Sequence, residues 1–167
     1  VSLARFRALP GAEVRIIDFG KITGGIQHAK FFIVDDAQVF VGSHNFDYLA
    51  LSQIHELGIK VTHAETARRL KLVFEYDWKM SLTNERPESS EGPVFEALAD
   101  DFDMTASPIG WTPSGMKPSL PSLLAMIKSA KKSIRIQTMT YSPVEYAGGY
   151  WGEIDDALKD AAVRGVK

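Results

Sequence analysis

The sequence contains no cysteine, no long apolar run and almost no excess of charge of either sign. The absence of cysteine excludes a disulfide scaffold and any metal site built on thiolates, and it leaves the redox compartment undetermined. No stretch of about 18 consecutive apolar residues is present, so the sequence predicts no transmembrane segment. The 19 Lys and Arg residues nearly balance the 21 Asp and Glu residues, which gives no overall sign of a nucleic-acid or anionic membrane partner.

What the chain does contain is typical of a soluble globular domain. Its 167 residues are 45% apolar and 24% charged, which is unlike the composition of disordered and fibrous proteins. The chain begins with Val1 and no signal peptide can be read there, and residues 161–167 resemble a helix end followed by the opening of a strand. We therefore interpret the sequence as part of a longer protein, and it does not determine the cellular compartment.

Periodicity and turn residues predict alternating strands and helices. In the first half they predict a strand at 12–18, a glycine-bearing loop at 20–25, a hairpin of 27–34 and 38–41, a short helix at 46–51, a strand at 56–61 and a helix at 64–80. Residues 81–110 hold seven acids against one base and read as a surface linker. Beyond it the patterns predict a helix from 119, a strand at 133–140 and a helix at 151–163. This order indicates an α/β domain.

Two short motifs carry the chemistry. His28, Lys30 and Asp35 form the pattern H-x-K-x4-D, and Gly42-Ser43-His44-Asn45 begins seven residues after Asp35. Alternation along the predicted strand would direct His28 and Lys30 to one face. An imidazole can act as a nucleophile or a general acid near neutral pH, and a lysine can stabilise negative charge on a phosphate oxygen. The combination predicts phosphoryl chemistry.

The remaining motif residues have different expected places. The segment from Gly42 to Asn45 is predicted at a strand-to-helix corner, where backbone N–H groups and the side chains of Ser43 and Asn45 would face an anion at a helix N-terminus. Asp35 has the opposite strand parity to His28 and falls in the predicted hairpin turn. We therefore expect Asp35 to form hydrogen bonds within the hairpin.

These motifs resemble the phospholipase D superfamily, whose signature is this HKD motif. The likeness is greatest to a subfamily of animal endolysosomal phospholipase D-like exonucleases and the related poxvirus envelope proteins. Outside the motif it rests on residues 11–18, 46–58, 141–143, 151–156 and 164–167. The resemblance implies a mixed β-sheet flanked by helices in α-β-α layers. It divides the chain into the back part of a first repeat (1–80), an acidic linker (81–118) and the front part of a second repeat (119–167).

The resemblance also implies a mechanism. Two HKD motifs meet across a pseudo-two-fold axis, where one histidine attacks the phosphorus to form a phosphohistidine and the other protonates the leaving oxygen. Water then hydrolyses the intermediate, or an alcohol accepts it in transphosphatidylation. No metal or other cofactor is implied. The implied substrates are phospholipids or single-stranded nucleic acids, and the sequence does not decide between them.

Roles for individual residues follow from the same resemblance. It implies that His28, Lys30, Asp35 and Glu56 are catalytic and that Lys30, Ser43, Asn45 and Tyr141 bind the substrate. Glu56 matches the carboxylate that orients a catalytic imidazole through its Nδ1–H, and an oriented base requires such a partner.

A second H-x-K is absent, because His44, His55 and His63 are not followed by lysine two residues later. The second half of the site would come from the rest of a longer chain or from a second copy in a homodimer. The alternative is a catalytically silent scaffold or interaction module.

Overall fold

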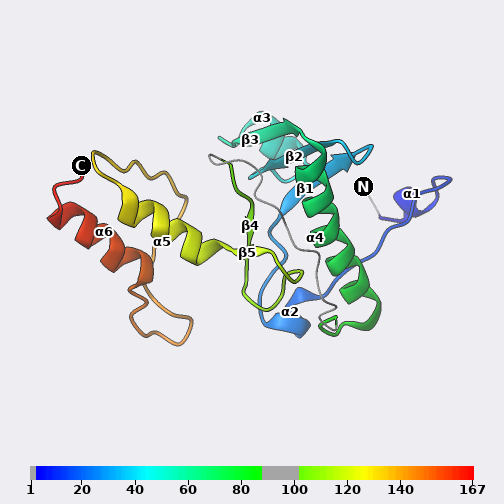
Figure 1. The fold of residues 1–167 in the computed structure, drawn as a ribbon. Helices are drawn as coiled ribbons and strands as arrows, with labels where there is room; N and C mark the ends of the chain where they lie inside the picture. The colour runs from blue at the N-terminus through cyan, green and yellow to red at the C-terminus, as the bar shows by residue number, and fades with distance from the viewer. Residues whose placement is uncertain (1–2, 88–101) are drawn as a thin grey trace. The chain divides into compact units, whose positions relative to one another are not determined.

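The computed structural model describes residues 3–87 and 102–167. The chain divides into two compact units, one of residues 1–104 with 111–115 and one of residues 105–110 with 116–167. Both helices and strands are present, which confirms the predicted mixed α/β class (Figure 1).

A three-stranded antiparallel sheet forms the first unit, in the order β1 (Lys30–Val34), β2 (Gln38–Gly42) and β3 (Gly58–Thr62). The predicted hairpin of β1 and β2 is confirmed. The expectation that its first strand begins at residue 27 is wrong, because β1 begins at Lys30. The Ala29 N–H donates to the Gln27 side chain at 3.0 Å instead of to a neighbouring strand. His28 therefore precedes the sheet.

The turn between β1 and β2 is built by two aspartates. Asp35 and Asp36 have φ values of 53° and 51°, in the left-handed region that aspartate tolerates better than most residues. The Asp36 carboxylate forms an ion pair with the Lys71 ammonium at 2.6 Å, so Asp36 connects the hairpin to the long helix that follows the sheet. The contact from the turn to the helix is thus made by Asp36, the neighbour of the motif residue Asp35.

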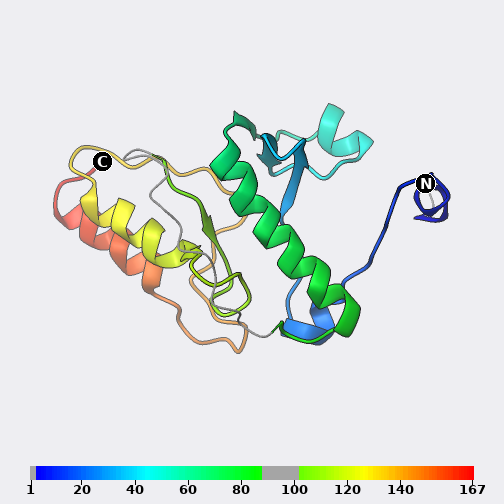
Figure 2. The same cartoon turned by 45° about the vertical axis from the view of Figure 1, so that its right-hand side comes forward.

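The core of the first unit lies between the sheet and α4 (Ala64–Thr83), which confirms the helix predicted at 64–80 and extends it by three residues. Val39, Ala67 and Leu70 are buried at the centre, with Phe31, Ile33, Val61 and Met104 packed around them. Figures 1 and 2 show α4 running beside the sheet. Strand alternation places Phe31, Ile33, Val39 and Val61 on this one face.

The opposite face of the sheet carries an aromatic cluster. The rings of Phe32 and Phe40 stack at 5.3 Å, and the ring of Phe46 lies 5.6 Å from that of Phe32. Phe32 and Phe46 are 48% and 56% exposed. Lys30 shares this face because it lies two residues before Phe32 in β1. The face that presents Lys30 is therefore aromatic and open.

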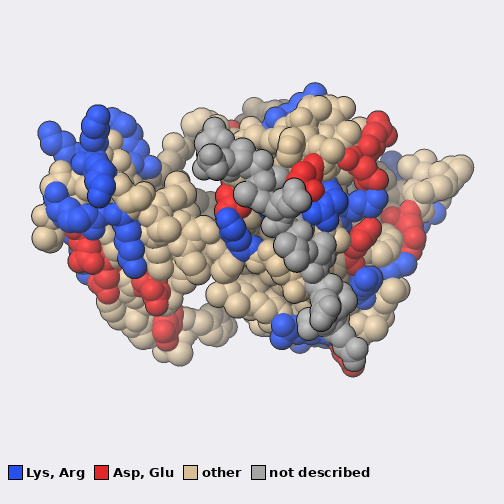
Figure 3. Space-filling model, viewed as in Figure 1, with Lys and Arg blue, Asp and Glu red and all other residues tan. Residues whose placement is uncertain are grey.

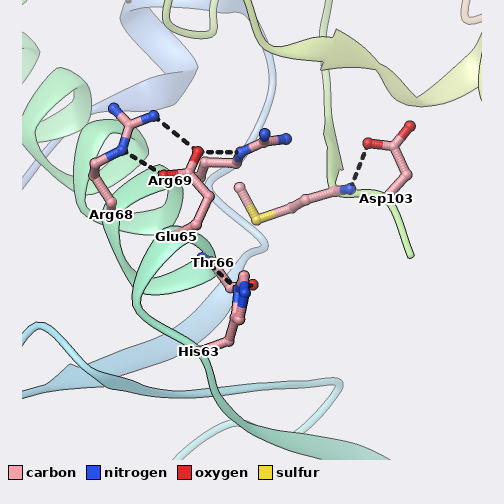
Figure 4. A network of polar contacts seen from close by, with 7 residues as sticks. His63, Glu65, Thr66, Arg68, Arg69 and Asp103 are labelled. Atoms are coloured by element: carbon pink, nitrogen blue, oxygen red, sulfur yellow. Dashed lines mark hydrogen bonds and ion pairs between the residues drawn. The ribbon is translucent and has the colours of Figure 1, made fainter. Parts of the chain in front are cut away.

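The first turn of α4 is fixed by charged and capping contacts (Figure 4). His63 is the N-cap residue, and its Nδ1 accepts from the Thr66 N–H at 3.3 Å. Glu65 accepts from the Arg68 guanidinium at 2.7 and 2.8 Å and from the buried Arg69 at 2.9 Å. These hydrogen bonds lower the pKa of Glu65 to about 2, and the largest effect comes from Arg68.

We expect Glu65→Gln to lower the free energy of unfolding at pH 7 by about 2 kcal/mol, because two guanidinium groups lose an ionised acceptor. A carboxyl pKa lowered from 4.5 to about 2 stabilises the fold above pH 4.5, and this contribution disappears as the pH falls through about 2. Urea unfolding at pH 7 and pH 2.5 should show the difference between parent and variant shrinking. Glu75→Gln, an exposed acid on the same helix, is the control and should change stability little. An equal loss in both variants would contradict the prediction.

Two local predictions in the first unit are wrong, and a third is confirmed with a shifted start. Residues 12–18 form no strand, since they pair with no other strand in the described chain. The predicted loop at 20–25 overlaps a short helix, α2 (Phe19–Thr23). Asp18 caps its N-terminus, and Gly24 terminates it by adopting a left-handed conformation. The helix predicted at 46–51 is α3 (Tyr48–Ser52), and it begins two residues late because Asp47 caps it. A further short helix, α1, spans Leu3–Arg7.

The second unit contains two helices that lie side by side, α5 (Ser119–Ser129) and α6 (Glu153–Val163), which confirms both predicted helices (Figures 1 and 2). Two short strands, β4 (Thr105–Ala106) and β5 (Lys117–Pro118), pair in parallel. The strand predicted at 133–140 is not formed. Among the described residues, the Ile134 N–H donates to the Lys167 carbonyl at 2.7 Å and the Lys167 N–H donates to the Lys132 carbonyl at 3.0 Å. One such pairing does not make a strand.

Charge is separated within the second unit. Figure 3 shows Lys and Arg gathered over the C-terminal ends of α5 and α6. The first turn of α6 instead holds Glu153, Asp155 and Asp156, where the helix dipole favours negative charge. No described helix has the length and apolar character needed to cross a membrane.

The predicted linker at 81–118 is described only in part, because residues 88–101 lie outside the described residues. The end of α4 and both short strands fall within its remaining parts. The proposed division of the chain at residues 80 and 118 stays a prediction.

Candidate functional site

Sheet topology brings most of the predicted site residues to one end of the sheet. Lys30, Gly42 and Gly58 are in register across the three strands. His28 lies two residues before β1, Ser43 follows β2 directly, Asn45 comes two residues later, and Glu56 lies two residues before β3. Segments that are distant in the sequence thus meet at the end of the sheet that is opposite the hairpin turn.

Asp35 is not part of this group. It follows the last residue of β1, and five residues of strand separate it from the other end by about 16 Å. The structure therefore places the motif aspartate in the hairpin turn, away from His28 and Lys30. The expected turn position of Asp35 is confirmed, and the catalytic role that the resemblance implies for it stays a prediction.

Ser43 connects the end of β2 to the start of β3. Its hydroxyl donates to the Glu56 carboxylate and accepts from the Leu57 N–H at 3.1 Å. The Ser43 N–H donates to the Leu57 carbonyl at 3.0 Å. In the part of the chain that the structure describes, no hydrogen bond joins Glu56 to an imidazole. Glu56 is thus held by Ser43, and its implied role toward a histidine stays a prediction.

The expected anion site at a helix N-terminus is wrong. The helix after the Gly-Ser-x-Asn motif begins only at Tyr48, and the Asp47 carboxylate accepts from the Ala50 N–H at 2.9 Å. A carboxylate thus already occupies the N-terminus of this five-residue helix. The N-terminus of this helix is therefore not free to hold a phosphate.

The glycine of the motif has a packing reason. A Cβ on Gly42 would lie 2.8 Å from Nδ1 of His44 and 2.9 Å from the Leu57 carbonyl oxygen. The paired Gly58 faces the ring of Phe40 just as closely. Gly42 therefore leaves room for the His44 ring, and Gly58 lets β3 lie close to the Phe40 ring of β2.

Three side chains at this end of the sheet are available to a ligand. His28 and Asn45 are exposed and Lys30 is half-buried. Within residues 3–87 and 102–167 none of the three side chains makes a hydrogen bond or ion pair. In these two described ranges, no group of three His, Asp or Glu side chains is arranged to hold a metal ion. An imidazole, an ammonium and an amide together suit an anionic phosphate ligand.

Sequence analysis missed a contact beside His28. The Gln27 side chain accepts from the Ala29 N–H at 3.0 Å and donates to the Asp77 carboxylate of α4 at 2.5 Å. Burial raises the pKa of Asp77 to about 6, and the hydrogen bond from Gln27 acts in the opposite direction. The sequence signal that could have revealed this contact is that Asp77 continues the helical spacing of the apolar residues Leu70 and Phe74.

Tyr141 belongs to the second unit and lies in a polar cluster there. Its hydroxyl donates to Asp155 at 2.6 Å, which raises the pKa of Tyr141. The Tyr150 hydroxyl donates to the same carboxylate at 2.7 Å. This hydrogen bond is the largest of several contacts that raise the pKa of Tyr150 to about 12. Lys159 pairs with Asp155 at 2.5 Å. The phenol of Tyr141 is thus engaged within its own unit, and its implied substrate contact stays a prediction.

Comparison with known proteins gives consistent matches. Residues 2–78 match the family described as "Cardiolipin synthase, PLD-like domain". The chain is 33% identical over 169 residues to the 5'-3' exonuclease PLD3 of Xenopus laevis, which covers 90% of the chain and 34% of that protein. It is 32% identical to the 5'-3' exonuclease PLD3 of Homo sapiens, over 94% of the chain and 36% of the relative. A probable phospholipase D of Caenorhabditis elegans is 31% identical, over 93% and 32%. The chain thus spans about a third of these relatives.

Proposed function

The chain belongs to the phospholipase D superfamily, and from this premise we propose that it supplies one half of a metal-independent phosphodiesterase site centred on His28. The observation that carries this proposal is the meeting of His28, Lys30 and Asn45 at one end of the sheet. These side chains come from two different segments, and all three have their polar groups available.

The proposed reaction passes through a phosphohistidine. One imidazole nitrogen attacks the phosphorus, so that an N–P bond forms and the P–O bond to the leaving group breaks. A second histidine gives its proton to the leaving oxygen, which departs as an alcohol. Water then attacks the phosphorus, its proton goes to the second histidine, and the N–P bond breaks to release a phosphomonoester. An alcohol in place of water would give transphosphatidylation.

The other residues act on charge and orientation. The Lys30 ammonium and the Asn45 amide donate to the non-bridging oxygens, where negative charge grows in the transition state. Ser43 holds Glu56 by the hydroxyl-to-carboxylate hydrogen bond, and Glu56 is proposed to orient an imidazole when the two halves are assembled. The second histidine comes from another part of a longer chain or from a second copy of this one.

Nucleic acid is the proposed substrate, because two of the relatives reported above are named as 5'-3' exonucleases. Phospholipid is the second candidate, and it is favoured by the relative named as a probable phospholipase D. Both substrates present the same phosphodiester to the three side chains of the site.

The proposal is tested by hydrolysis of a chromogenic phosphodiester in excess EDTA, followed by a 5'-labelled single-stranded oligonucleotide and phosphatidylcholine vesicles. The chain is assayed alone, and the full-length product of its gene is assayed beside it. We expect hydrolysis that EDTA does not reduce, and faster cleavage of the oligonucleotide than of the lipid. Activity that requires a divalent ion would contradict the mechanism. Failure to cleave any of the three substrates in either form would favour a catalytically silent scaffold.

A further inference from the structure

We propose that Gln27 and Asp77 act as a positioning pair that holds the backbone around His28 in its reactive geometry. Neither residue is assigned a role by the motifs. The inference rests on the proposed function of His28, but the contact itself can be tested without catalysis.

The need for such a pair follows from where His28 lies. β1 begins at Lys30, so His28 receives no support from the hydrogen bonds between strands. Its imidazole is exposed, and in the described parts of the chain it makes no hydrogen bond. A reacting group must be held within a fraction of an ångström to keep its rate, because small displacements reduce rates steeply. Some other contact must therefore fix this segment.

The Gln27 side chain provides that contact on both sides of His28. Its carbonyl oxygen accepts from the Ala29 N–H at 3.0 Å, which closes a ring of atoms across His28. Its amide nitrogen donates to Asp77 at 2.5 Å. Both ends of the Gln27 amide are thus used, and together they fix the residues before and after the histidine.

Asp77 is itself well supported. It lies in the third quarter of the 20-residue α4, and its neighbour Trp78 stacks on Phe74 at 5.4 Å and beneath the Arg15 guanidinium at 4.1 Å. Arg15 also donates to the Trp78 carbonyl at 3.3 Å. The carboxylate therefore reaches Gln27 from a part of α4 where the next residue, Trp78, is held by Phe74 and Arg15.

The pair acts from behind the site. Asp77, Gln27, Ala29 and Phe31 line a single pocket of about 240 Å³ in the first unit. Phe31 belongs to the core face of the sheet, whereas Lys30 projects to the opposite, aromatic face. A substrate held by Lys30 would thus not reach Asp77, which makes the pair positioning residues rather than catalytic ones.

The experiment reverses the polarity of the contact. Gln27→Glu places a carboxylate against Asp77 and should weaken the pair at pH 7.5, because the two acids repel each other unless they take up a proton. Adding Asp77→Asn restores it, because the amide introduced on α4 would donate to one oxygen of the introduced glutamate while the other oxygen accepts from the Ala29 N–H. Gln137→Glu, an exposed change of equal charge in the second unit, is the control. All variants are compared at pH 7.5 after their melting temperatures show that they are folded.

Two quantities are measured on the whole protein. The kcat for the chromogenic phosphodiester should fall about tenfold or more in Gln27→Glu, with KM within about twofold, because the phosphate contacts of Lys30 are unchanged. The solvent-exchange rate of the Ala29 amide proton, measured by NMR, should rise several-fold. The double variant should recover both values to within about threefold of the parent, and Gln137→Glu should change neither.

The proposal is overturned if Gln27→Glu keeps the parent kcat and exchange rate, or if the double variant recovers neither. Should Gln27→Glu fail to fold, Asp77→Ala removes the acceptor without adding charge, and its Ala29 exchange rate decides. If the parent protein hydrolyses no phosphodiester, the proposed function fails on its own. The exchange rates then still establish or exclude the positioning contact.

Discussion

Replacing His28 by alanine is expected to lower kcat for the chromogenic phosphodiester by at least about a thousandfold in excess EDTA. The variant lacks one of the two imidazoles of the mechanism, which either attacks the phosphorus or protonates the leaving oxygen. The side chain is exposed, so its loss should leave the melting temperature within a few degrees of the parent. Loss of activity with retained stability would place His28 in the chemistry itself.

The matched control is His55→Ala. His55 is also exposed, it precedes β3 by three residues, and it lacks the lysine two positions later. We expect this variant to keep its activity within about twofold. Equal activity of parent and His28→Ala would refute the proposed mechanism, and an equal loss in both variants would point to a general effect on folding at this end of the sheet.

The second large effect is expected for Lys30→Met, which keeps much of the length of the side chain and removes its charge. We expect kcat/KM to fall by about a hundredfold, because the ammonium stabilises charge that grows on the phosphate oxygens in the transition state. Inhibition by inorganic phosphate should weaken in parallel, which gives a measure of binding that does not depend on turnover.

Lys60→Met is the control for this prediction. Lys60 lies opposite Phe40 in β3, on the same open face of the sheet as Lys30, but two residues further from the end where His28 lies. The two variants change the charge equally, so general electrostatic attraction of the substrate affects both. If Lys60→Met loses as much activity as Lys30→Met, a specific phosphate contact by Lys30 is excluded.

Elements that depend on local pattern could be predicted from the sequence. α4, α5 and α6 follow from apolar residues at helical spacing, and the β1–β2 hairpin follows from two β-rich runs around Asp35 and Asp36. In each of these cases the residues that form the element stabilise it through their own hydrogen bonds, and α4 and α6 also bury residues on one face. The H-x-K and Gly-Ser-x-Asn spacing likewise identified the candidate residues before their placement was visible.

Elements that need a distant partner could not be predicted in this way. Residues 12–18 and 133–140 have strand-like composition, yet a strand forms only where a second backbone accepts its hydrogen bonds. After the Gly-Ser-x-Asn motif the helix begins only at Tyr48, and Asp47 caps it. This cap removed the expected anion site at the start of the helix.

By itself, then, the sequence determined the family, the α/β class and the residues that carry the proposed chemistry, because these depend on residue type and short spacing. Only the tertiary structure joined Ser43 to Glu56 and set Asp77 of α4 against Gln27. These outcomes depend on sheet register and on packing of α4 between residues up to 50 positions apart. No local pattern specifies such contacts, because their free energy is gained only once the core has assembled.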